Sequence, residues 1–319
     1  MAGAGAWSFG LPKEADAAAD STRRRIVMSS PPATIWPMRA SPTTAVHLSV
    51  SIVVHNSDPQ RLWQTLQSLV LAARAARRAG SLSRLTLLLV DNASQAAYRA
   101  DLERRLQDWP GDTFIEVCCH MQPDNRGFGA GHNAVLEGLD SDLHLVLNPD
   151  VELREDTLAI GVAALAEGRG IALVSPRVVG ARGEQEFLCK RYPSVLTLLL
   201  RGFAPAVLRR RFDRRLAHYE MRELRDAREP VDVPIASGCF MLLPTAVLRA
   251  VGGFDEAFFL YFEDFDLSLR LRHGGRLQYR PDMCIVHHGG YAARKGLRHV
   301  LYFLRSALRF FSRHGWRWV

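Results

Sequence analysis

Hydrophobic runs and helix-period stretches alternate along the first half of the chain. Continuous apolar runs predict β-strands at residues 47–55, 85–90, 114–118 and 143–147. The stretches between them have a helical period and predict helices at residues 59–78, 99–106 and 129–139. Such alternation, with strands that are apolar throughout, is typical of a mostly parallel sheet with helices on both faces. The pattern therefore predicts an α/β fold.

The pattern is less regular in the rest of the chain. Residues 199–230 are dense in charge and predict a solvated helix or a mobile segment between the two halves of the sheet. Further on, residues 235–243 are apolar, residues 245–251 have a helical period, and residues 283–286 predict a strand. Residues 1–45 are rich in Ala, Ser, Thr and Pro without a sustained period, so we expect a disordered leader.

Residues 291–319 predict a basic amphipathic helix, with seven Lys and Arg residues and no acid in a chain of formal charge +8. The apolar stripe comprises Leu297, Val300, Leu301, Leu304, Leu308 and Phe311, and the opposite side carries Arg298, Arg305, Arg309 and Arg313. This stripe is expected either to lie on an anionic membrane surface or to dock on the core with solvated arginines outside. No nucleic-acid-binding motif accompanies the basic residues, so nucleic acid is not an expected partner.

Composition limits the class of protein further. The 319 residues are 48% hydrophobic, enough for a large core, and the five cysteines show no CxxC spacing. We therefore expect neither a disulfide framework nor a structural zinc site, and a reducing cytoplasm fits best. No apolar run approaches the roughly 18 residues that span a bilayer, and the N-terminus lacks the order of a signal peptide, so the protein is expected to stay on the side where it is made.

Polar residues follow the predicted strands, at the edge where ligands of parallel sheets bind. They include His55, Asn56 and Asp58 after the first strand, Asp91 after the second, and the turn Asn148-Pro149-Asp150 after the strand at residues 143–147. Asp150 could hold Mg²⁺ or Mn²⁺, which prefer carboxylate oxygens, or the turn could merely cap the next helix. His287 and His288 end an apolar strand and could complete a metal site or be structural.

Two further segments carry candidate chemistry. Glu263 and Asp264 lie among aromatic residues, where a raised pKa suits a general base; the alternative, acids favoured by a helix N-terminus, explains Asp266 well. The glycine-rich stretch 124–133 enters a helix and could approach phosphates or a ribose. A dehydrogenase is disfavoured, because the stretch reads G-x-G-x-G and follows a later strand than the first.

These segments, in this order, resemble the family 2 glycosyltransferases of GT-A fold, with a Rossmann-like sheet, and in particular their bacterial rhamnosyltransferase-like branch. The resemblance covers roughly residues 47–315 and rests on VSIVVHN, LVDNAS, NRGFGAGHN, LNPDV, GGFDEAFFLYFEDFDLSLRLRHGG and PDMCIVHHGG. It implies a transferase domain at residues 46–290, with a nucleotide-sugar half at 46–152 and an acceptor half at 153–290, followed by the helix at 291–319.

The resemblance also implies roles for single residues. Asp264 is the expected catalytic base and Glu263 an acceptor-side or supporting residue. The expected metal ligands are Asp150 and His287, with His288 as the alternative, and Asn148 stands where the family's metal motif has its first Asp. The expected nucleotide-sugar contacts are His55, Asn56, Asp58, Asp91, Asn125, Gly127, Phe128, Asn133 and Asn148.

The implied reaction is an inverting transfer from a nucleotide-diphosphate sugar, with a divalent cation, to a glycan or lipid-linked glycan acceptor in bacterial surface polysaccharide synthesis. The first expected donor is dTDP-rhamnose and the second a UDP-hexose. The implied place is the cytoplasm, at the inner face of the membrane if the last helix binds lipid. The competing hypothesis is a catalytically silent protein of the same fold that binds a sugar nucleotide or a polysaccharide.

Overall fold

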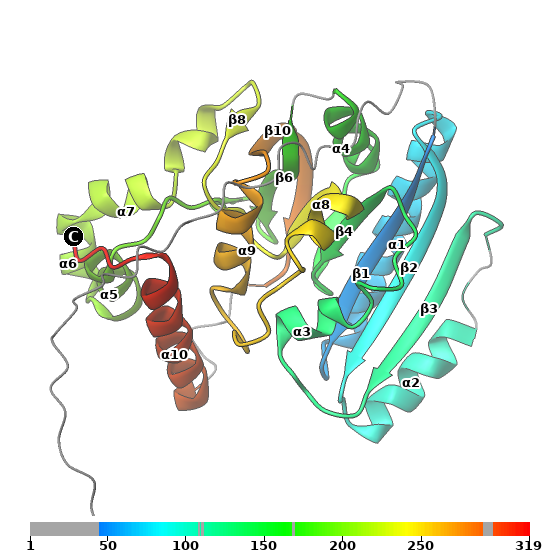
Figure 1. Ribbon diagram of the computed structural model, residues 1–319, viewed down its shortest axis with the longest axis horizontal. Helices are drawn as coiled ribbons and strands as arrows, with labels where there is room; N and C mark the ends of the chain where they lie inside the picture. The colour runs from blue at the N-terminus through cyan, green and yellow to red at the C-terminus, as the bar shows by residue number, and fades with distance from the viewer. Residues whose placement is uncertain (1–44, 108, 110–111, 168–169, 290–295) are drawn as a thin grey trace, which may run out of the picture. The chain divides into compact units, whose positions relative to one another are not determined.

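The computed structural model describes residues 45–319 except for residues 108, 110–111, 168–169 and 290–295. Nearly all of the predicted leader, residues 1–45, and the start of the predicted C-terminal segment, residues 291–319, therefore lie outside the described residues. The described residues build one sheet with helices packed against it (Figure 1). The predicted α/β class is confirmed.

Four parallel strands form the N-terminal half of the sheet. They are β1 (Val46–Val54), β2 (Leu82–Asn92), β3 (Ile115–Gln122) and β4 (Leu143–Leu147), in the spatial order β3-β2-β1-β4. All of β4 and the last seven residues of β1 are buried, because helices cover both faces. Side chains alternate along β1, so Ile52 and Val53 belong to core clusters on opposite faces of the sheet.

Six further strands extend the sheet: β5 (Val151–Leu153), β6 (Ile171–Gly180), β7 (Gln185–Glu186), β8 (Val231–Asp232), β9 (Phe240–Pro244) and β10 (Arg276–His287). The spatial order continues from β4 as β9-β6-β10-β5, with β7 beside β6 and β8 beside β10. β9 is antiparallel to β4 and β6, whereas β10 is parallel to β6 and antiparallel to β5. The last pairing sets His287 opposite Val151, next to the turn that follows β4.

Helices pack on both faces of this sheet: α1 (Pro59–Arg78), α2 (Ala96–Gln107), α3 (Phe128–Asn133), α4 (Thr157–Ala166), α8 (Thr245–Ala250) and α9 (Glu263–Leu271). On one face, Leu66 of α1 and Val162 of α4 share a core cluster with β1 and β4. On the other, Val247 of α8 and Leu267 of α9 share a second cluster with β9. The predicted coverage of both faces is confirmed.

Two elements differ from the sequence prediction. A helix is predicted over residues 129–139, but α3 ends at Asn133, and the residues that follow form turns with hydrogen bonds between residues three apart. β6 is not predicted, because Pro176 interrupts its apolar run. Pro176 is tolerated there, since the pairing of β10 changes register just after its partner Arg280.

The charge-dense stretch at residues 199–230 is neither one solvated helix nor without structure. It folds, with the residues just before it, into α5 (Val195–Phe203), α6 (Ala206–Arg211), α7 (Asp213–Tyr219) and the 3₁₀ helix η1 (Arg222–Asp226). α5 and α7 bury Leu198 and Tyr219 in an aromatic cluster with Phe258, Phe262 and Phe310. This cluster joins the short helices to the C-terminal helix and to the residues that lead into α9.

The C-terminal helix α10 (Gly296–His314) docks through a different face from the predicted one. Its buried residues are Ser306, Ala307, Phe310 and Phe311. Of the predicted apolar stripe, only Phe311 is buried, and four leucines of that stripe remain 82%, 64%, 44% and 58% exposed: Leu297, Leu301, Leu304 and Leu308. We call these four residues the leucine row.

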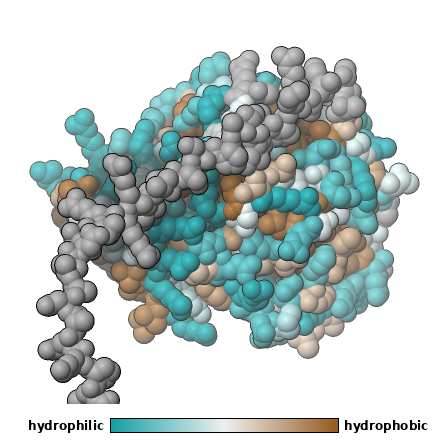
Figure 2. Space-filling model, in the orientation of Figure 1, coloured by the Kyte–Doolittle hydropathy of each residue, from teal (hydrophilic) through white to brown (hydrophobic). Residues whose placement is uncertain are grey.

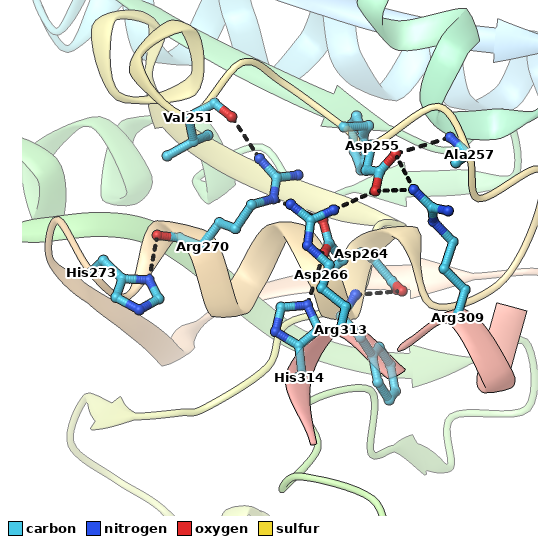
Figure 3. A network of polar contacts seen from close by, with 12 residues as sticks. Val251, Asp255, Ala257, Asp264, Asp266, Arg270, His273, Arg309, Arg313 and His314 are labelled. Carbon is cyan, nitrogen blue, oxygen red and sulfur yellow. Dashed lines mark hydrogen bonds and ion pairs between the residues drawn. The ribbon is translucent and has the colours of Figure 1, made fainter. Parts of the chain in front are cut away.

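Acidic residues on the body of the protein explain this docking face. Arg309 and Arg313 of α10 both pair with Asp255, and His314 contacts Asp266 at 2.8 Å (Figure 3). Arg309 and Arg313 thus pair with an acid while they remain 44% and 42% exposed, as expected for arginines on the outer side of a docked helix. Among the described residues, no helix combines the length and the apolar character required to cross a membrane.

Candidate active site

The turn after β4 presents Asp150 at the carboxyl end of the sheet. The Asn148 N–H donates to the Cys239 carbonyl at 3.0 Å, and the Thr65 hydroxyl of α1 donates to the Pro149 carbonyl at 3.0 Å. These contacts fix the turn from both sides. The Asp150 side chain is 31% exposed, yet its Oδ1 atom is buried and has no hydrogen-bond partner within the described structure. A carboxylate oxygen left in this state is suited to a cation.

His287 faces that carboxylate from the end of β10. Its Nε2 atom lies 3.7 Å from Asp150 Oδ1, and its Nδ1 atom lies 2.9 Å from Glu186 Oε2 on β7. Burial opposes protonation of the ring, but the hydrogen bond to Glu186 and the charge of Asp150 outweigh it, so the pKa of His287 is raised. Both carboxylates therefore favour positive charge at this position. A carboxylate behind a histidine is also the usual support of a metal-binding imidazole.

His288 points to a different partner. Its Nε2 atom lies 2.6 Å from Glu152 Oε1, and only its backbone N–H reaches Asp150, at the carbonyl, over 2.9 Å. Gly289 packs directly against His287 and Asp150: a Cβ atom on Gly289 would lie 2.6 Å from His287 Nε2 and 2.9 Å from Asp150 Oδ2. Of the two predicted histidines, His287 is the one whose ring faces Asp150.

Asp150 and His287 fit a divalent cation, but not as a complete set of ligands. Within the described residues, no three His, Cys, Asp or Glu side chains are placed to hold one metal ion together. Mg²⁺ and Mn²⁺ take six ligands as a rule and often share substrate phosphates. These two residues would therefore hold the cation together with the diphosphate of a bound donor.

Residues 124–128, which we call the donor loop after their predicted role, are held by Asn92 at the end of β2. The Asn92 side-chain amide donates to Asn125 Oδ1 at 3.0 Å and to the Gly127 carbonyl at 2.9 Å, and its Oδ1 atom accepts from the Arg126 N–H. The prediction for Asn125 places it in this loop, but its side chain also has this local partner. Asn92 itself is not among the predicted residues, although it belongs to the motif LVDNAS.

Gly127 is required at its position by the backbone. Its φ is +95°, and a Cβ atom there would lie 2.2 Å from the Phe259 carbonyl oxygen. That carbonyl accepts the Phe128 N–H at 3.0 Å. The Phe128 ring packs edge-on against Phe254 and lies beside Gly238, whose hypothetical Cβ atom would be 3.1 Å away. The donor loop is thus seated on the segment that precedes α9.

Two of the predicted donor contacts have structural partners. Asp58 caps α1 by accepting the N–H groups of Gln60 and Arg61. The Asn133 side chain exchanges hydrogen bonds with the backbone of Phe254, at 2.8 and 2.9 Å. These contacts account for both residues without a ligand, so their donor-binding roles stay predictions.

Asp91 is buried beside an arginine that the sequence analysis does not single out. Asp91 is 0% exposed, and its Oδ2 atom lies 2.5 Å from Nε of Arg99 on α2. His55 approaches the same strand end, with Nδ1 2.8 Å from the Asn92 carbonyl, and Asn56 adopts a left-handed conformation with φ of 49°. The three predicted residues thus lie together at the ends of β1 and β2, and Arg99 covers the Asp91 carboxylate.

Asp264 lies in the first turn of α9, beside residues 238–239, which also hold the Asp150 turn. Its Oδ2 atom accepts the Gly238 N–H at 2.9 Å and its Oδ1 atom accepts the Phe265 N–H at 2.9 Å. The next residue after Gly238 is Cys239, whose carbonyl accepts the Asn148 N–H. Burial raises the pKa of Asp264, although the backbone hydrogen bonds lower it in part. One short segment thus connects the two predicted functional turns.

Glu263 has a different environment. It is 5% exposed, and its Oε2 atom is buried without a hydrogen-bond partner within the described structure. Burial first, and the charge of Asp264 second, raise the pKa of Glu263 well above its ordinary value. The neutral form of Glu263 is therefore favoured, and Asp264 is the acid of this pair that can carry charge.

The backbone before α9 is held in a strained form by α10. Tyr261 and Phe262 both have left-handed conformations, with φ of 71° and 65°. Ser306 of α10 donates to the Leu260 carbonyl at 2.9 Å, and Tyr261 Oη lies 3.0 Å from His299 Nδ1. The aromatic residues around the acid pair thus serve largely to anchor this segment on α10, which sequence spacing does not reveal.

Comparison with known proteins identifies the family of this chain. Residues 49–252 match the family model described as glycosyl transferase family 2. The chain is 28% identical over 211 residues to the N-acetylglucosaminyl-diphospho-decaprenol L-rhamnosyltransferase of Mycobacterium tuberculosis, a match covering 60% of this chain and 66% of that protein. It is 24% identical over 197 residues to rhamnosyltransferase WbbL of Escherichia coli, covering 59% and 70%. The match thus spans just under two thirds of the mycobacterial protein's length.

Solved structures share the fold at lower identity. The mannosyltransferase PcManGT of Pyrobaculum calidifontis, in complex with GDP-Man and Mn²⁺, superposes with a TM-score of 0.54 at 18% identity, covering 87% of this chain and 68% of that one. GalNAc-T7 with UDP, GalNAc and Mn²⁺ also gives 0.54, at 17% identity, covering 77% and 43%. Together with the family match, these findings show that the chain belongs to the family 2 glycosyltransferases and has the GT-A fold.

Proposed function

We propose that the protein is an inverting glycosyltransferase in which Asp264 is the catalytic base. The observation that carries the proposal is the connection of a partly buried carboxylate, Asp264, with the Asp150 turn through the segment 238–239. The charges of Asp150 and Asp264 both raise the pKa of Cys239, after burial, which is consistent with their closeness. A base and a cation ligand on neighbouring turns are what a single displacement at an anomeric carbon requires.

The proposed step is an in-line displacement. Asp264 accepts the proton of an acceptor hydroxyl, the hydroxyl oxygen forms a bond to the anomeric carbon, and the bond from that carbon to the donor diphosphate breaks with its electron pair going to the leaving oxygen. Because attack and departure occur on opposite sides, the configuration inverts. The raised pKa of Asp264 improves its ability to take the proton.

We also propose Mg²⁺ or Mn²⁺ as cofactor, held by Asp150 and His287 together with the donor. When bound, the cation would neutralise the charge that develops on the departing diphosphate. The unpartnered Asp150 Oδ1 atom and the Glu186 support behind His287 favour this assignment. Asn148 supplies no charge, so the donor phosphates contribute more to binding of the cation.

For the donor we propose dTDP-rhamnose first and a UDP-hexose second. The names of the two curated relatives support this order, since both are rhamnosyltransferases. The predicted donor residues His55, Asn56 and Asp91 and the donor loop lie at the same edge of the sheet as the Asp150 turn. That placement supports a nucleotide over β1 and β2 with its sugar directed toward Asp264.

For the acceptor we propose a lipid-linked glycan in surface polysaccharide synthesis, with the protein at the inner face of the cytoplasmic membrane. The mycobacterial relative's name contains such a lipid-linked sugar. The leucine row lies exposed on α10, and the neighbouring Arg298 and Arg305 have no acidic partner among the described residues. An exposed apolar row beside basic residues suits an anionic bilayer.

The test is a donor screen read by product configuration. The protein is incubated with each nucleotide sugar and Mg²⁺, and release of nucleoside diphosphate and the anomer of the first-formed product are followed by NMR. We expect release from dTDP-rhamnose with inversion. Retained configuration would contradict the displacement, and tight donor binding without release or transfer, with acceptor present, would favour the silent sugar-nucleotide-binding protein.

A further inference from the structure

A basic hollow lies between the short helices α5, α6 and α7. Its volume is about 310 Å³, and it is lined by four arginines and two acids: Arg201, Arg209, Arg210, Arg222, Asp213 and Glu220. We call it the arginine pocket. Nothing in the displacement described above uses it, because it lies outside the donor edge of the sheet.

The charges in the arginine pocket are only partly balanced. Arg222 pairs with Asp213 at 2.7 Å and with Glu220 at 2.8 Å, and Arg201 pairs with Glu220 at 3.1 Å. Arg209 and Arg210 have no acidic partner in the part of the chain that the structure describes. Four guanidinium groups against two carboxylates leave two positive charges without compensation. The arginine pocket is therefore prepared for an anion with about two negative charges, such as a diphosphate diester.

Exposed apolar side chains lie on α5 and α6, next in sequence to the residues that line the arginine pocket. Leu199 and Phe203 of α5 are 50% and 56% exposed, and Val207 and Leu208 of α6 are 79% and 41% exposed. Figure 2 shows hydrophobic side chains beside hydrophilic ones at the left edge, where Figure 1 places α6. A free nucleotide or a nucleic acid would gain nothing from these exposed apolar side chains, whereas a hydrocarbon chain attached to a phosphate would.

The arginine pocket is linked to the segment that leads into α9. Tyr219 ends α7 next to Glu220 and packs in the aromatic cluster with Phe262, which precedes the acid pair. Burial raises the pKa of Tyr219, and the charges of Arg201, Asp264 and Glu220 all act on it. Tyr219 therefore connects Glu220, which lines the arginine pocket, to the aromatic cluster that precedes α9.

We propose that the arginine pocket binds the diphosphate of a lipid-linked acceptor, with the lipid chain lying on Leu199, Phe203, Val207 and Leu208. Guanidinium groups suit this ligand because their planar donors bind phosphate oxygens in pairs. The proposal rests on the proposed function, since it names the acceptor of the same reaction. It assigns the anchoring of that acceptor to α5 and α6, apart from the leucine row of α10.

The test measures binding rather than transfer. Farnesyl diphosphate serves as probe, with EDTA present so that no cation can hold a diphosphate in the donor site. The variant R209Q/R210Q removes both unbalanced charges, and R211Q/R214Q removes the same charge from neighbouring exposed positions that do not line the arginine pocket. We expect the affinity to fall at least tenfold in R209Q/R210Q and less than twofold in R211Q/R214Q.

Three outcomes would overturn the proposal. Equal affinity in both variants would show that the arginine pocket does not hold the diphosphate. Inorganic diphosphate binding as tightly as farnesyl diphosphate would show that the exposed apolar side chains of α5 and α6 do not contact the lipid chain. If R209Q/R210Q lost binding to phosphatidylglycerol vesicles but kept its affinity for farnesyl diphosphate, the ligand would be a bilayer phospholipid. Because the readout is binding, specific binding without any sugar transfer would contradict the proposed function alone.

Discussion

Two buried histidines predict how the stability of the protein depends on pH. His132 and His144 are 4% and 1% exposed, and both contact the Ser51 hydroxyl, at 2.7 and 2.8 Å. Burial lowers the pKa of each ring to about 3, because the charged form loses its hydration. Both histidines are therefore neutral in the folded protein near neutral pH.

The sign and size of the effect follow from proton binding. In the unfolded chain each ring binds a proton near its ordinary pKa of 6.5, whereas in the folded protein it does so only near pH 3. Between these values the unfolded state binds more protons, so the free energy of unfolding falls as the pH falls. At about pH 5 the loss is about 2 kcal/mol for each histidine and about 4 kcal/mol for the pair.

Urea unfolding at pH 8 and pH 5 tests this prediction in the wild type and in His132→Phe. The phenylalanine keeps an aromatic ring beside Phe128 and Phe254 but cannot titrate. Between the two pH values the wild type should lose about 2 kcal/mol more than the variant. Contributions from other groups, such as the buried Glu263, cancel in this difference. Equal losses in the two proteins would show that His132 is not kept neutral by burial in the folded protein.

Two further predictions concern the cation and the membrane. Glu186→Gln removes the carboxylate charge behind His287, so Mn²⁺ affinity in the presence of a nucleoside diphosphate, measured by calorimetry, should fall about tenfold or more. The triple change L301S/L304S/L308S removes most of the exposed leucine row, so affinity for anionic vesicles, measured by flotation, should fall at least about tenfold while the melting temperature stays unchanged.

Each of these changes has a matched control. Glu184→Gln removes a carboxylate next to the same short strand β7 that makes no ion pair with His287, and should leave Mn²⁺ affinity unchanged; an equal loss in both variants would contradict the role of Glu186. Leu71→Ser alters a 49% exposed leucine on α1 and should leave vesicle binding unchanged. Flotation of the triple variant at the wild-type level would show that the leucine row does not contact lipid.

The first half of the sheet could be predicted from the sequence because its hydrophobic runs are continuous and uninterrupted. The run at residues 47–55 becomes β1, and the run at 143–147 becomes β4 with the predicted bounds. β6 could not be predicted, since Pro176 in its middle argues against a strand unless the register change in β10 is known. Pairing of distant strands is decided by packing, which periodicity along one segment does not contain.

The candidate site could likewise be predicted only in part. Asp150, His287 and Asp264 follow predicted turns or strands and are brought to one edge of the sheet. Glu186 and Arg99 were missed, because a two-residue strand and a helix face bring them to their partners from outside the motifs. The predicted docking face of α10 is wrong, because hydrophobic periodicity does not distinguish the leucines, which stay exposed, from the aromatic residues, which are buried. What decides between them is the position of acids elsewhere in the fold, such as Asp255.

The most direct test of Asp264 as the catalytic base is the turnover of Asp264→Asn with the donor found by the screen. The change keeps the shape of the side chain and an oxygen that can accept the Gly238 N–H, but removes the base. We predict a fall in kcat of about 10² to 10⁴ with donor affinity unchanged. The surface change Asp282→Asn should leave kcat unchanged. Transfer by Asp264→Asn at the wild-type rate would contradict the central claim.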